Sequence, residues 1–76
     1  MTEILIFADN KPPRLLRVSE YREKIRYFYS DGEIKCMSVV MFFATFMSGK
    51  TGVVLYAADK SVTREEVLAA QDALIS

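Results

Sequence analysis

The stretch from Met37 to Met47, with the sequence MSVVMFFATFM, is an almost unbroken apolar block in a chain of only 76 residues. Two further segments, Ile4 to Ala8 and Val53 to Ala58, are apolar at both alternating sets of positions. A domain of this size has little interior, because its surface is large relative to its volume. We therefore expect one subunit to leave part of this apolar surface uncovered, and association with another protein to cover it.

The composition and the cysteine content limit the class of protein. Hydrophobic residues make up 51% of the chain and charged residues 26%, which is typical of a folded globular protein, and the length fits one domain over residues 1–76. Cys36 is the only cysteine, so an intrachain disulfide is excluded and a reducing, cytoplasmic location is expected. The N-terminal apolar stretch lacks the features of a signal peptide, and the longest apolar run is shorter than the roughly 20 residues that span a membrane. We expect no membrane partner.

Three segments have the composition of strands. Residues 3–8 combine large apolar side chains and are followed by Asp9, Asn10 and two prolines, which predicts a strand and then a turn. Residues 14–23 are ambiguous between strand, helical turn and loop, and a short strand is favoured. Residues 52–58 predict a strand without a polar face. The two strands that are apolar on both faces belong in the centre of a sheet, where both faces are covered.

A β-hairpin is predicted over residues 24–38. The Asp31-Gly32 pair suits a two-residue type I′ turn, in which both residues take positive φ. This turn aligns Tyr27 with Cys36 on the face toward the core, and it places Met37 on the outward face. Cys36 is therefore expected to be a buried, unreactive thiol.

Beyond the hairpin the apolar spacing changes, which predicts a buried helix at about residues 38–48. One set has the spacing of a helical stripe, namely Val39, Phe42, Phe43 and Phe46. Valine and phenylalanine are mediocre helix formers, so a strand is the alternative, although it would be unusually long after the hairpin. The reverse side is also apolar, and the predicted apolar interface consists of Met37, Val40, Met41, Ala44 and Met47.

The C-terminal helix, over residues 63–75, has the clearest signals. Thr63 as N-cap and Glu66 three residues later form a capping box, and Val62 with Val67 occupies the positions of a hydrophobic staple. The predicted fold is therefore a single α+β domain with a small sheet of 4–5 strands. It includes the 24–38 hairpin, one buried helix at about 38–48 and the C-terminal helix.

Residue types tied to catalysis are few. The chain has no histidine, which removes the commonest general base and transition-metal ligand. Residues 48–52 match the end of a phosphate-binding loop, but Ala44 stands where that motif needs glycine, so we interpret them as a helix end and a turn. We expect no enzyme, no cofactor and no metal site. An enzyme would instead need a deep pocket lined by Cys36, Tyr27 or Lys50.

The charges are unevenly distributed, although the formal net charge is zero. Residues 11–26 contain six basic and two acidic side chains, a net charge of +4. With the aromatic residues of segment 11–29, they make a nucleic-acid-binding module the alternative function, since bases stack on aromatic rings and cations hold phosphates. A solvated basic edge that protects a strand from aggregation is the structural alternative. The predicted binding residues are Arg14, Arg17, Arg22, Lys24, Arg26 and Phe28.

The function favoured by elimination is binding. We expect a small non-catalytic protein-interaction or regulatory module that forms a homodimer and occupies a surface on a larger protein partner. Salt-insensitive capture of a protein would favour this function, and steeply salt-dependent binding would favour nucleic acid.

Overall fold

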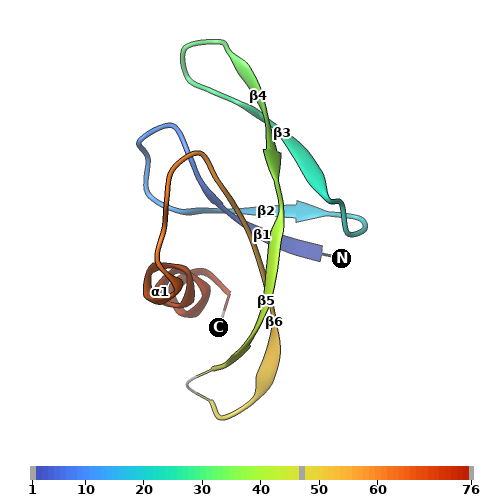
Figure 1. Cartoon of the computed structure of the whole chain (residues 1–76), viewed down its shortest axis with the longest axis vertical. Coiled ribbons are helices and arrows are strands. Elements are labelled where there is room, and N and C mark those ends of the chain that lie inside the picture. The colour runs from blue at the N-terminus through green and yellow to red at the C-terminus, as the bar shows by residue number, and fades with distance from the viewer. Residues whose placement is uncertain (1, 47, 76) are drawn as a thin grey trace.

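The chain forms six strands and a C-terminal helix in the computed structural model, which describes residues 2–46 and 48–75. The strands form a four-stranded sheet in the order β2-β1-β6-β5 and a two-stranded hairpin of β3 and β4 (Figure 1). This small α+β arrangement confirms the predicted fold class in outline. The elements are β1 (Thr2–Phe7), β2 (Arg14–Val18), β3 (Lys24–Phe28), β4 (Ile34–Ser38), β5 (Val40–Thr45), β6 (Thr51–Ala58) and α1 (Arg64–Leu74).

The two strands that are apolar on both faces lie at the centre of the four-stranded sheet, as predicted, and they are neighbours. β1 pairs with β6 in parallel, with Leu5 opposite Tyr56, and with β2 in antiparallel orientation. Ile4 and Ile6 belong to the hydrophobic core on one face of the sheet, whereas Leu5 and Phe7 belong to the core on the other. The strand has no polar side because each face of the sheet carries its own core.

Different elements cover the two faces of this sheet. α1 packs on one face through Val67 and Ala70. The β3-β4 hairpin packs on the other face through Ile25 and Met37, against β1 and Ala57 of β6. The molecule is 40 Å long, and the turns of the β3-β4 and β5-β6 hairpins point in opposite directions, the first at the top of Figure 1 and the second at the bottom.

The start of α1 confirms the predicted N-cap and hydrophobic staple. Thr63 is the N-cap, and its hydroxyl oxygen accepts a hydrogen bond from the Glu66 backbone N–H at 3.1 Å. Val62 and Val67 both pack in the core between α1 and the sheet, as a hydrophobic staple requires. At the other end of α1, Leu74 is 41% exposed.

The buried helix predicted at about residues 38–48 is wrong, because residues 40–45 form strand β5. Its residues pair antiparallel with β6, from Val40 opposite Tyr56 to Thr45 opposite Thr51. Branched and aromatic side chains pack well on a pleated surface, and β6 supplies an apolar partner strand, so sheet pairing outweighs the helical spacing. The strand is not overlong, because the chain changes partners at Val39: β4 pairs with β3, and β5 pairs with β6.

The 24–38 hairpin is confirmed, but its turn differs from the predicted type I′ turn. The Tyr29 carbonyl accepts from Gly32 N–H at 3.0 Å, and Tyr29 N–H donates to the Glu33 carbonyl at 2.8 Å. Gly32 has a φ of 91°, whereas Asp31 is not among the described residues with positive φ. These features define a three-residue loop with a type I turn and a glycine bulge.

The longer loop shifts the hairpin register by one residue from the predicted one. Ile25 pairs with Met37, and Arg26 pairs with Cys36. A shift of one residue moves every side chain of a strand to the other face. Met37 is consequently buried and Cys36 is exposed, which reverses the predicted placement of both.

The short strand favoured for the ambiguous segment is confirmed, whereas the turn expected near residue 49 follows a strand and not a helix. Residues 14–18 of the ambiguous segment form the predicted short strand, β2, and residues 19–23 form a loop. Residues 48–50 belong to the β5-β6 turn, in which Gly49 has a φ of 86° and donates its N–H to the Phe46 carbonyl. The segment that matches the end of a phosphate-binding loop is therefore a hairpin turn.

Candidate protein-interaction surface

An uncovered apolar surface lies on β5 and β6, on the sheet face opposite α1. It consists of Met41, Phe43 and Val53, whose exposed fractions are 54%, 67% and 47%. Phe43 is opposite Val53 in the register and Met41 is two residues along the same strand, so the three side chains share one face. We call these residues the open face. None of the described elements covers it, because α1 lies on the other side of β5 and β6 and the β3-β4 hairpin lies toward the opposite end (Figure 1).

The open face has clear boundaries. Toward the centre of the molecule, Leu55 is partly buried against the core beneath the hairpin. Toward the β5-β6 turn, the hydroxyl oxygens of Thr45 and Thr51 lie 3.4 Å apart. No charged residue interrupts the cross-strand pairs between these limits. An apolar patch with a polar boundary is typical of protein interaction sites.

The backbone edge of β5, in contrast, is guarded. The Phe46 backbone N–H donates to the Lys50 carbonyl, and along an antiparallel pair only every second residue bonds to the partner strand. Phe43 is three residues from Phe46, so its backbone N–H and carbonyl point away from β6. The Arg64 guanidinium donates to the Phe43 carbonyl oxygen at 2.8 Å and lies 4.9 Å from the centre of the Phe42 ring. A charged side chain at a strand edge opposes the addition of another strand. The open face, and not the edge, is therefore the accessible part of β5.

Removal of this guard should cause uncontrolled association. In an Arg64→Ala variant, the Phe43 carbonyl loses its donor, and we expect slow growth of large, thioflavin-binding assemblies at concentrations where the parent stays small. Light scattering followed over days measures this. Glu65→Ala, on the neighbouring helical residue, serves as the control. Equal scattering from Arg64→Ala and the parent would show that Arg64 does not protect the edge.

The predicted interface residues divide into two groups. Val40 and Met41 are exposed, whereas Met37 and Ala44 are buried in the two cores. Met47 lies outside the described residues. The prediction of a helix did not include Phe43 and Val53 in the interface. If residues 40–45 and 51–58 are treated as strands, every second residue shares a face, and this alternation could have identified both. Val40 is opposite Tyr56, on the α1 side of the sheet, and so does not belong to the open face.

The predicted nucleic-acid-binding residues also divide. Arg17 forms an ion pair with Glu3 at 3.2 Å, and Arg14 donates to the Tyr27 hydroxyl at 3.3 Å. Because they stand an odd number of positions apart on β2, Arg14 and Arg17 lie on opposite faces of the sheet. The structure brings together Arg22, Lys24, Arg26 and Phe28 on β3 and the loop before it.

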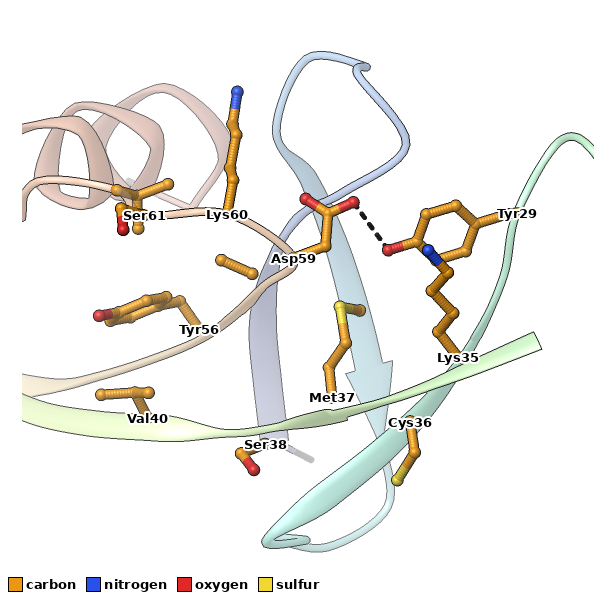
Figure 2. Close-up of a pocket in the computed structure, with 12 residues that line it drawn as sticks. Tyr29, Lys35, Cys36, Met37, Ser38, Val40, Tyr56, Asp59, Lys60 and Ser61 are labelled. Carbon is orange, nitrogen blue, oxygen red and sulfur yellow. Dashed lines mark hydrogen bonds between the residues drawn. The ribbon is translucent and has the colours of Figure 1, made fainter. Parts of the chain in front are cut away.

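A polar network, which we call the clamp, ties the end of the β3-β4 hairpin to the sheet. The Asp59 carboxylate accepts from the Tyr29 hydroxyl at 2.7 Å (Figure 2). It also accepts from Asp9 N–H at 3.0 Å. The Asp9 carboxylate accepts from the N–H and the hydroxyl of Ser30, at 2.9 and 3.1 Å. The bonds from Ser30 lower the pKa of Asp9, and the bond from Tyr29 lowers that of Asp59. Burial, followed by the bond to Asp59, raises the pKa of Tyr29 to about 12.

The clamp predicts a distinctive tyrosine titration. The pKa of Tyr29 in the folded protein, about 12, is above its ordinary value of 10.0. Neutral Tyr29 therefore stabilises the fold fully below pH 10.0, and this contribution is lost as the pH rises toward 12. Ultraviolet absorbance should show one of the four tyrosines ionising late. Tyr29→Phe should abolish the late step, whereas Tyr21→Phe should leave it. Simultaneous ionisation of all four would contradict the clamp.

A groove of about 630 Å³ lies beside the clamp, between β4 and the chain that follows β6. Cys36 borders it, but Figure 2 shows the Cys36 side chain pointing away from Asp59 and Tyr29. Neither Tyr27 nor Lys50 is among its lining residues. Within residues 2–46 and 48–75, no three cysteine or acidic side chains are grouped closely enough to hold a metal ion. Beside this groove, the clamp connects the end of the β3-β4 hairpin to the ends of β1 and β6.

Comparison with known proteins identifies no relative. The chain matches no family model, no curated protein and no solved structure. None of the helices in the described part of the chain is long and apolar enough to cross a membrane. The surfaces of the molecule are therefore the basis for assigning a function.

Proposed function

We propose that this protein is a small non-catalytic interaction module that forms a homodimer through the open face and presents the assembled dimer to a larger protein partner. The observation that carries the proposal is the exposure of Met41, Phe43 and Val53 side by side on one sheet face. Removing such side chains from water favours association by roughly 25 cal/mol per Å² of apolar area. An isolated subunit keeps these side chains in water and so does not gain this free energy.

The chemistry of the open face suits a second copy of the chain. A two-fold contact brings the same surface of each copy together, so the surface must be compatible with itself. An uncharged patch meets this condition, since no like charges oppose each other within it. The formal net charge of zero also leaves no overall repulsion between two copies. Met41 adds a flexible side chain that can fill gaps between two packed sheet faces.

The guarded edge supports the same geometry. Arg64 occupies the position on β5 at which a strand from another copy would pair, so packing of one open face on the other is favoured over a continuous intermolecular sheet. We also propose a reducing, cytoplasmic setting, in which the exposed Cys36 thiol stays unoxidised.

Sedimentation equilibrium of the parent protein at micromolar concentrations tests the proposal. We expect a reversible monomer-dimer equilibrium that changes little with salt, because the contact is apolar. A dye that fluoresces on apolar surfaces should bind increasingly as dilution releases monomers. A protein that stays monomeric throughout, without dye binding, would contradict self-association through this face.

A further inference from the structure

We propose a second binding site, for single-stranded nucleic acid, on β3 and the adjoining cleft between β2 and β3. It is separate from the open face, which lies on β5 and β6. The site combines a row of basic side chains, an apolar cleft and an exposed aromatic ring. These are the components with which proteins bind single strands without sequence preference.

Basic and apolar side chains together line the cleft. It has a volume of about 520 Å³ and lies between β2, the loop that follows it, and the hairpin. Leu16 and Val18 contribute apolar side chains from β2. The charged residues that line the cleft are all basic, namely Arg22, Lys24 and Arg26. A cleft lined by charges of one sign attracts a ligand of the opposite sign, here a polyanion.

These three cations are available to a ligand. Arg17 is occupied by Glu3, and Lys11 lies 3.7 Å from the Asp9 carboxylate. Arg22, Lys24 and Arg26, in contrast, make no ion pair or side-chain hydrogen bond with any residue in ranges 2–46 and 48–75. Glu20 and Glu23 are nearby in sequence but do not line the cleft. Phosphate groups would supply the missing counter-charges.

Phe28 distinguishes nucleic acid from an acidic protein as the ligand. Lys24, Arg26 and Phe28 alternate along β3 and so project from the same outward face of the hairpin. Phe28 is 72% exposed and continues the basic row. Acidic side chains would engage only the two cations, whereas a nucleotide strand can place phosphates on the cations and stack a base on the ring. The row therefore fits a nucleotide strand better than a carboxylate-bearing surface.

Fluorescence anisotropy with a labelled oligothymidine of roughly ten nucleotides tests this site. If three cations each neutralise one phosphate, the logarithm of the affinity should fall with the logarithm of salt concentration with a slope of about −2. Arg26→Ala should reduce that slope by about 0.7. Phe28→Ala should weaken binding about tenfold without changing the slope, because stacking releases no counterions.

Two controls keep the outcomes distinct. Lys50→Ala removes an exposed lysine in the β5-β6 turn and should leave binding unchanged. Phe43→Glu, on the open face, should disrupt the dimer but retain the salt slope and the effect of Phe28→Ala. Absence of binding at low salt would overturn the site and leave the dimer proposal intact. Equal affinity for a polyglutamate peptide, or no effect of Phe28→Ala, would also overturn it.

Discussion

A Phe43→Glu variant should be monomeric at concentrations where the parent protein is a dimer. Phe43 is the most exposed member of the open face, and it lies between Met41 along the strand and Val53 across it. A carboxylate there must lose its hydration when two apolar faces pack together. Central aromatic residues of interfaces typically contribute 2 kcal/mol or more, so we expect the dissociation constant to rise by about thirtyfold or more.

The matched control is Phe28→Glu. Like Phe43, Phe28 is a phenylalanine on a strand, and its exposed fraction of 72% is close to the 67% of Phe43. Phe28 differs in location, because it lies on the outward face of the β3-β4 hairpin. It should leave the dimer intact, as sedimentation equilibrium can show. If both variants dissociate equally, the effect comes from added charge and not from the open face. If neither dissociates, the dimer uses another surface.

A Leu5→Ala variant should lose much of its stability. Leu5 is 0% exposed and lies on β1, between β2 and β6, in the core that α1 covers. Truncation of a buried leucine to alanine costs about 2–5 kcal/mol. A domain of this size has a total unfolding free energy of only about 4–11 kcal/mol. Urea titration followed by circular dichroism should therefore show a much lower midpoint or an incomplete folded baseline.

Leu74→Ala is the corresponding control, because Leu74 is at the end of α1 and is 41% exposed. Its effect should be within about 0.5 kcal/mol of the parent. Both titrations need one fixed protein concentration, since dimerisation adds to the apparent stability of the folded chain. A small effect of Leu5→Ala would mean that the core beneath α1 contributes little to folding.

Local signals predicted the parts of the fold that depend on neighbouring residues. Thr63 and Glu66 placed the start of α1, and the doubly apolar pattern around Leu5 placed β1 at the centre of a sheet. The helix start was predictable because the N-cap hydrogen bond joins residues within one helical turn. The central strand was predictable because a strand covered on both faces must be apolar on both. The type of the segment around Phe43 could not be predicted in the same way. Its strand form depends on pairing with β6, and its spacing fits a helix equally well.

One error in a turn changed the predicted site. The Asp31-Gly32 pair is compatible with both a two-residue and a three-residue loop, and the choice decides whether Cys36 or Met37 is buried. The error did not affect the prediction for Lys24, Arg26 and Phe28. These residues occupy alternate positions of one strand and share a face in either hairpin register. The clamp between Asp59 and Tyr29 could not be predicted, since it joins residues far apart in the sequence.

The parallel pairing of β1 with β6 has a consequence for the order of folding during synthesis. Leu5 is translated well before its neighbour Tyr56, which is made only after the β3-β4 hairpin and β5 have been translated. Contacts between distant positions form slowly, whereas each hairpin can close locally. Until β6 has emerged, β1 therefore lacks one of its two neighbours in the sheet, and its apolar side chains stay exposed to water.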